Sequence, residues 1–150
     1  MMKNAMIIDN EDSLAFCSGR FEFSPERPGM KKIHRLSNQT VIVNVDSGII
    51  DYYSYWLWKY KNIKLSRPAW GAHVTIVNDK DRVKDIESFE RLKDDFNKSY
   101  IKIFHSVKLR KQWQFWILDV EPSEEFLFIR NALGIKENFP FHITIGRDDV

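Results

Sequence analysis

The sequence predicts an α+β fold in which two pseudo-symmetric lobes of antiparallel sheet, with helices on their outer faces, surround a central cleft. Residues 40–78 and 113–146 each show the pattern of a strand, a helix and a second strand. The last strand of each unit contains the same phrase, His-Val-Thr-Ile at 73–76 and His-Ile-Thr-Ile at 142–145. A repeat of this length indicates a duplicated lobe rather than a solenoid. With 43% hydrophobic residues, we expect one domain over 1–150.

The first part of the chain shows no clear periodicity of apolar residues. Residues 1–39 are expected to form an irregular N-terminal extension, with a short strand near Arg20–Phe23. The β-branched run Thr40–Val45 predicts the first regular strand, and Ser47 can cap the helix that follows it. Apolar residues at helical spacing then continue to Tyr60, before the first His-x-Thr strand.

A helix and a strand are expected between the two units. Apolar residues recur at helical spacing over 83–96, and strict alternation over 101–109 predicts a half-buried strand. His105 shares the apolar face of that strand, so we interpret it as a hydrogen-bonded core residue rather than a catalytic one.

The second unit repeats the order of the first. Lys111-Gln112 is expected at a turn, and 113–120 is a nearly continuous apolar run, typical of a strand buried on both faces. Pro122-Ser123-Glu124-Glu125 predicts a helix start, and Gly134 is placed to end that helix before the second His-x-Thr strand.

Charge and composition exclude several classes of protein. A net charge of +2 argues against coating of long duplex DNA, although a small anionic ligand fits it. Cys17 is the single cysteine, so an internal disulfide is excluded and a reducing compartment is expected. The sequence has neither a membrane-length apolar stretch nor a signal-peptide pattern at its start. We therefore expect a cytoplasmic protein without membrane or DNA partners.

The repeated phrase places two kinds of polar group side by side. Residues i and i+2 of a strand share a face about 6.7 Å apart, so His73 lies beside Thr75 and His142 beside Thr144. Two such strands at a cleft would surround one small anionic group with two imidazoles and two hydroxyls. With an ordinary pKa near 6.5, one imidazole can act as base while the other acts as acid on a phosphodiester.

Two other interpretations of the histidines are weighed against catalysis. Strand histidines are often satisfied by neighbouring groups, but duplication with the same i+2 threonine favours chemistry. A metal site is the second alternative, because histidine is a common ligand. The nearest carboxylates of matching parity, Asp79 and Asp148, lie six residues along the strands, about 20 Å away if the chain is extended. We therefore expect no metal site.

The two phrases resemble the double H-x-[TS]-x signature of the 2H phosphoesterase superfamily, which includes RNA 2′,3′-cyclic phosphodiesterases. The resemblance covers about residues 40–147 and implies acid and base roles for His73 and His142, phosphate binding by Thr75 and Thr144, and no metal or other cofactor. Within that superfamily, the short length and the segment Arg67-Pro68-Ala69-Trp70-Gly71-Ala72 before the first motif are most similar to compact phage proteins that degrade the cyclic oligonucleotide signals of CBASS immunity. For a phage-encoded protein, this implies the host cytoplasm.

Residues that flank the motifs are candidates for substrate binding. Trp70 lies three residues before the first histidine, where it can stack on a base, and Arg67 and Arg147 can bind phosphate. In the helix before the first motif, Tyr53 and Tyr60 fit a core face. Other aromatic residues of that helix either stack bases or are simply exposed: Tyr52, Tyr55 and Trp58.

These observations lead to three functional hypotheses. The first is a metal-independent phosphodiesterase that degrades 3′–5′-linked cyclic di- or trinucleotides by attack of a ribose 2′-OH. The second is a 2′,3′-cyclic phosphodiesterase that acts on RNA ends with the same four residues. The third is a nucleotide-binding module that sequesters its ligand; two proton-transfer groups argue against it, since binding alone does not require them.

Overall fold

The computed structural model describes residues 13–27, 39–78, 80–81, 83, 85–137 and 139–148, and its described part has the expected α+β class. The strands are β1 (Leu14–Phe23), β2 (Val41–Val45), β3 (His73–Val77), β4 (Tyr100–Ser106), β5 (Arg110–Gln112), β6 (Phe115–Val120) and β7 (Phe141–Arg147). The helices are α3 (Gly48–Lys61), α4 (Ile86–Phe96) and α5 (Glu124–Ala132).

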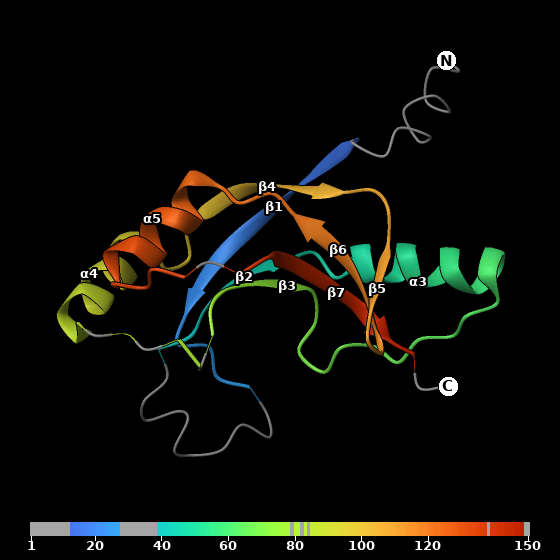
Figure 1. Ribbon diagram of the computed structural model, residues 1–150, viewed down its shortest axis with the longest axis horizontal. Coiled ribbons are helices and arrows are strands. Elements are labelled where there is room, and N and C mark those ends of the chain that lie inside the picture. Colours follow the sequence, from blue (N-terminus) through green and yellow to red (C-terminus); the bar gives the residue numbers. More distant parts are fainter. Residues whose placement is uncertain are drawn as a thin grey trace.

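One antiparallel sheet runs through the molecule and closes on itself (Figure 1). The strand order is β4-β1-β2-β3-β7-β6-β5, and β4 also pairs with β6 between His105 and Val120. Six strands therefore form a closed antiparallel barrel, and β5 pairs with β6 as the first strand of a hairpin. The two strand-helix-strand units expected from the sequence share this one sheet, with β3 and β7 as neighbours at its centre.

The core lies inside the barrel and extends under α5. Phe126 of α5 packs into it, with its ring centroid 6.4 Å from that of Phe21 and 5.1 Å from that of Phe141. Alternation along the two central strands points every second side chain into this core. The inward residues of β3 and β7 have no exposed surface: Val74, Ile76, Ile143 and Ile145.

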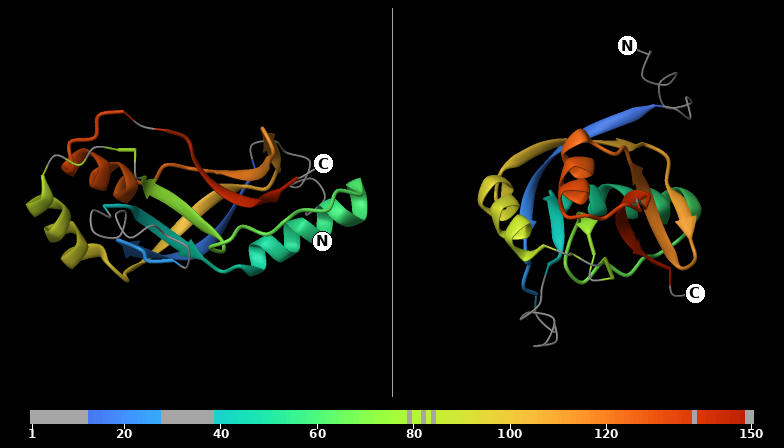
Figure 2. Two further views of the ribbon diagram at one scale, coloured as in Figure 1. Left: turned by 90° about the horizontal axis from the view of Figure 1, so that it is seen from below. Right: turned by 60° about the vertical axis from the view of Figure 1, so that its left-hand side comes forward.

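The helices lie at opposite ends of the barrel. Figures 1 and 2 show α4 and α5 together at one end, while α3 runs outward at the other end. Asp85 caps α4 by accepting from two backbone N–H groups, and Ser123 caps α5 as the sequence predicts. Ser47 makes no side-chain cap on α3; Asp46 accepts from the Gly48 N–H instead. Among the described residues, no helix has the length and apolar character needed to cross a membrane.

The segment expected to be irregular contains the longest strand. Leu14–Phe23 forms β1, which pairs with both β2 and β4, so the short strand near Arg20–Phe23 is part of a ten-residue one. Within β1, Gly19 lies where a Cβ would come within 2.3 Å of a Val43 methyl group. A close crossing of strands requires glycine there. Residues 1–12 and 28–38 of the expected extension lie outside the described part.

The turn between β5 and β6 lies two residues later than expected. Lys111 and Gln112 belong to β5, where they pair with Trp116 and Phe115. The turn is at Trp113-Gln114, with Trp113 at φ 58° and largely exposed, so the expected strand start at 113 was wrong. Hairpin geometry overrides the apolar pattern at this point.

His105 is a core residue, as expected. It is 4% exposed, and its Nδ1 lies 2.9 Å from the Ser106 carbonyl oxygen.

A buried arginine joins α5 to the end of β3. Arg130 is 1% exposed and donates to the Ile76 carbonyl and to Asp81, both at 2.9 Å, and to the Glu137 carbonyl.

We predict that Arg130→Met lowers the free energy of unfolding by about 3–5 kcal/mol in urea denaturation, because a carboxylate and two carbonyls lose their donor. The exposed Arg110–Asp119 pair provides the control, since Arg110→Met should cost about 1 kcal/mol or less. Equal losses would contradict this role of Arg130.

Candidate active site

The pairing of β3 with β7 brings the two repeated phrases together. Val74 is directly opposite Ile143 in an antiparallel pair. One step along each strand therefore puts His73 beside Thr144, and Thr75 beside His142. Since Val74 and Ile143 point into the core, these four polar side chains share the outer face of the barrel, where all are half-buried. The two histidines are diagonal neighbours, about 7–8 Å apart.

The neighbouring strands extend this arrangement with an approximate twofold symmetry. On β2, Asn44 pairs with His73 and Ile42 with Thr75; on β6, Asp119 pairs with His142 and Ile117 with Thr144. Each histidine thus has a polar neighbour on the adjacent strand, β2 or β6. Each threonine has a buried isoleucine in the same place. These residues form two rows across β2, β3, β7 and β6, in that order. The first row is Asn44, His73, Thr144 and Ile117, and the second is Ile42, Thr75, His142 and Asp119.

The surroundings of His73 define the state of its ring. Nδ1 lies 3.2 Å from the Gly71 carbonyl oxygen, which can only accept, so in this hydrogen bond Nδ1 carries the proton and Nε2 keeps its lone pair. Burial lowers the pKa of His73 below its ordinary value, and the charges of Arg27 and His142 lower it further. The Gly71 hydrogen bond and Glu22 act in the opposite direction on this pKa. At neutral pH, His73 is therefore suited to accept a proton.

A polar network adjoins His73 on the β1–β2 side. Arg27 donates to both carboxylate oxygens of Glu22, at 2.7 and 3.1 Å, and to the Asn44 side-chain oxygen at 3.3 Å. Asn44 donates back to Glu22 at 2.7 Å. The hydrogen bond from Arg27 holds the pKa of Glu22 below its ordinary value. These hydrogen bonds hold the Arg27 guanidinium near His73, and the Glu22 carboxylate balances most of its charge.

An ion pair occupies the corresponding place beside His142. Arg110 makes a bidentate pair with Asp119, at 3.0 and 2.8 Å. The hydrogen bond from Arg110 lowers the pKa of Asp119, and the charge of His142 contributes to the same shift. His142 therefore has a fixed, paired carboxylate on the neighbouring strand.

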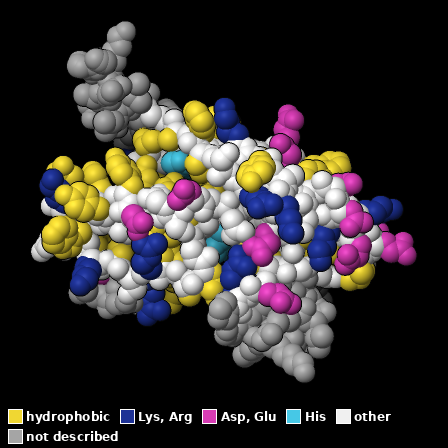
Figure 3. Space-filling view, turned by 180° about the vertical axis from the view of Figure 1, so that it is seen from behind, with side chains coloured by type: hydrophobic (Ala, Val, Ile, Leu, Met, Phe, Trp, Pro, Cys, Tyr) yellow, Lys and Arg dark blue, Asp and Glu magenta, His cyan; other side chains and the backbone are white. Residues whose placement is uncertain are grey.

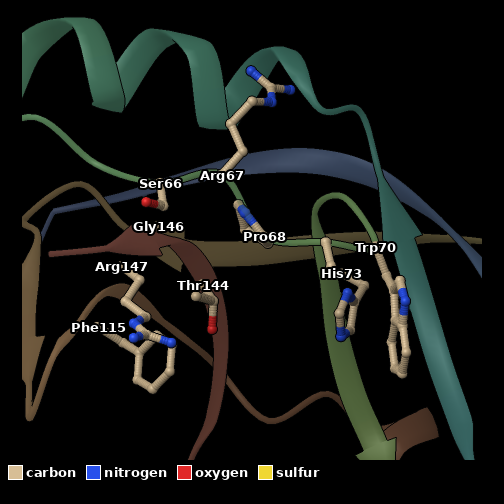
Figure 4. Close-up of a pocket in the computed structure, with 10 residues that line it drawn as sticks. Ser66, Arg67, Pro68, Trp70, His73, Phe115, Thr144, Gly146 and Arg147 are labelled. Atoms are coloured by element: carbon tan, nitrogen blue, oxygen red, sulfur yellow. The ribbon is translucent and has the colours of Figure 1, made fainter. Parts of the chain in front are cut away.

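An open pocket adjoins His73, and its volume of about 680 Å³ is within the usual size range of ligand sites. It is lined by Ser66, Arg67, Pro68, Ala69, Trp70, His73, Phe115, Thr144, Gly146 and Arg147. All three residues expected to bind substrate, Trp70, Arg67 and Arg147, are in this lining. Figure 4 shows the Trp70 and His73 rings next to each other and the Arg67 side chain pointing toward α3, where it pairs with Asp51. Thr75 and His142 lie outside the lining.

The pocket wall is attached to the end of β7. Ser66 and Arg147 exchange two backbone hydrogen bonds of 2.9 Å. A Cβ on Gly146 would lie 2.8 Å from both the Leu65 Cβ and the Ser66 carbonyl oxygen, so only glycine permits this close approach. The wall that carries Arg67 and Trp70 is therefore fixed relative to Thr144.

Sequence reasoning identified the four motif residues but missed their polar neighbours. Asn44 and Asp119 had a signal, because each is a single polar residue before the final valine of an apolar strand, at the same place in both units. Glu22 and Arg27 had none, since their positions depend on the register of β1.

No protein-family model matches the chain, and searches of curated proteins and of solved structures give no match. Within the described ranges, no group of three or more His, Cys, Asp or Glu side chains is arranged to hold a metal ion.

The electrostatics of His73 can be measured without an assay of function. We predict that the His73 imidazole titrates below about pH 6.5 by NMR, because burial disfavours its charged form. Arg27→Gln should raise this pKa, since it removes a nearby positive charge and leaves the Glu22 carboxylate without its ion-pair partner. A pKa above 6.5 in the wild type, or one unchanged by Arg27→Gln, would contradict the described environment.

Proposed function

We propose that the protein is a metal-independent phosphodiesterase that cleaves 3′–5′ ribonucleotide linkages beside a free 2′-OH. The observation that carries the proposal is the placement of His73, Thr75, His142 and Thr144 on neighbouring strands of one face. In this proposal the two strand-helix-strand units are the pseudo-symmetric lobes of a 2H phosphoesterase fold, and they meet at β3 and β7. The twofold arrangement of polar neighbours supports this interpretation.

The environments of the two histidines favour different roles. His73 Nε2 takes the proton of the ribose 2′-OH, because its pKa is lowered and its Nδ1 proton is already used by the Gly71 carbonyl. The 2′-oxygen then attacks phosphorus. Each such proton transfer contributes roughly 10²–10⁴-fold to the rate.

His142 completes the reaction on the opposite side of phosphorus. It donates a proton to the 5′-oxygen as the bond from phosphorus to that oxygen breaks, the role left to the second imidazole when His73 acts as the base. Thr75 and Thr144 donate to the equatorial oxygens, where negative charge accumulates. The first product ends in a 2′,3′-cyclic phosphate.

The pocket is compatible with a nucleotide attached to that phosphate. Trp70 and Phe115 offer apolar ring surfaces, and Arg67 and Arg147 offer positive charge. Together with the resemblance to phage proteins that act on CBASS signals, this favours cyclic di- or trinucleotides in the cytoplasm as substrates. RNA ends with a 2′,3′-cyclic phosphate are the second candidate, because the same four residues serve that reaction.

Removal of either imidazole tests the catalytic roles. We predict that His73→Ala and His142→Ala each lower kcat by roughly 10²–10⁴-fold, while thermal unfolding stays close to that of the wild type because both side chains are on the outer face. His105→Ala is unsuitable as a control because His105 is in the core, whereas Trp113→Ala changes an exposed turn residue and should leave kcat unchanged. Normal turnover in both histidine variants would place the active site elsewhere.

A modified substrate tests the nucleophile. We predict that a cyclic dinucleotide with a 2′-deoxyribose at the scissile phosphate binds as a competitive inhibitor and is not cleaved, because the attacking hydroxyl is missing. The ribonucleotide should be cleaved in excess EDTA, with a transient 2′,3′-cyclic phosphate detected by mass spectrometry. Cleavage of the deoxy analogue, or activity that requires a divalent metal, would contradict the mechanism.

A further inference from the structure

The helix α3 exposes an unusual number of aromatic side chains. Five rings on its surface are accessible: Tyr52, Tyr55, Trp56, Trp58 and Tyr60. The expected core position of Tyr60 was wrong, since this residue near the end of the helix is 62% exposed. Only Ile50 and Leu57 of this helix are fully buried, so the face toward the barrel is narrow and the rest is open. Figure 3 shows hydrophobic and basic side chains gathered at the end of the molecule where α3 lies. The proposed chemistry at His73 and His142 does not use this surface.

Apart from Asp51, which pairs with Arg67, the charged residues in and directly after α3 are basic. Between residues 52 and 70 the charged residues are Lys59, Lys61, Lys64 and Arg67, and none is acidic. Lys59 Nζ lies 5.6 Å from the ring centroids of both Tyr55 and Tyr60, and Lys61 Nζ lies 6.0 Å from that of Trp56. Ammonium groups next to exposed rings are the combination that binds phosphates and stacked bases of a single strand.

One stripe of the helix begins at the pocket. Asp51, Tyr55 and Trp58 have i, i+4 and i+7 spacing and therefore share a side of α3. Arg67, which lines the pocket, pairs with Asp51 at the start of this stripe. The Tyr55 and Trp58 rings are 6.3 Å apart, and both side chains are 56% exposed. A strand that leaves the pocket past Arg67 meets these two rings next.

We propose that the Tyr55–Trp58 stripe of α3, with Lys59 and Lys61, binds the bases and phosphates of a linear single-stranded RNA that continues out of the pocket. The inference rests on the proposed function for its chemistry and names an extended ribonucleotide strand as a substrate class. A second copy of the chain fits this face poorly, since a twofold contact would oppose lysines to lysines.

The test uses a fluorescent 2′-O-methyl oligoadenylate, which lacks the attacking hydroxyl and stays intact. The Kd of this RNA is measured by fluorescence anisotropy for the wild type and for the double variant Tyr55→Ala, Trp58→Ala. The Kd of the double variant should be higher by roughly 5- to 150-fold for each stacked base that is lost. Phe128→Ala is the matched control, because Phe128 is also helical and 56% exposed but lies on α5 at the other end of the barrel. It should leave Kd unchanged. A second double variant, Lys59→Ala with Lys61→Ala, tests the phosphate contacts. The slope of log K against log salt concentration should become less steep by about 1.4, because two phosphate contacts are lost.

The outcomes separate this inference from the proposed function. The Tyr55, Trp58 variant should turn over a cyclic dinucleotide normally and show a raised KM for a linear RNA only. If the wild type cleaves neither substrate, the proposed function fails, while the anisotropy still decides whether α3 binds RNA. An unchanged Kd in this variant would overturn the inference. It would also be overturned if α3 instead supports a dimer in sedimentation or binds anionic vesicles in preference to RNA.

Discussion

The pairing of Val74 with Ile143 is the contact on which the candidate site depends. It fixes the register of β3 against β7, and because side chains alternate along a strand, that register decides which residues share the outer face. A slip by one residue would turn one histidine and its threonine into the core. Full burial of Val74 and Ile143 makes such a slip costly, so the hydrophobic core holds the polar groups in place.

The twofold arrangement gives similar positions but different environments to the two histidines. His73 adjoins Asn44 and the Glu22–Arg27 pair, and its burial favours the neutral ring. His142 has a carboxylate, Asp119, as its direct neighbour. Similar backbone geometry in the two units therefore places the two imidazoles beside different polar neighbours.

Local patterns predicted the strands and helices that carry the motifs, and the i+2 spacing predicted that each histidine lies beside its threonine. Closure of the sheet was not predictable from local patterns, because it depends on β1, which lies in the segment expected to be irregular and pairs with strands far along the chain. The register of β3 against β7 and the Arg27 network depend on contacts between residues far apart in the chain, which no local period encodes. The turn at Trp113 was misplaced because the apolar pattern continues through it.

The most direct measurement of the central claim uses a ribonucleotide substrate with a 5′-bridging sulfur at the scissile phosphate. A thiolate leaves without protonation, so this substrate needs a base but no acid. The proposed roles predict that His142→Ala cleaves it at a rate close to that of the wild type, while His73→Ala remains impaired. Rescue of His73→Ala instead would reverse the roles, and failure to rescue either variant would contradict acid–base catalysis by this pair.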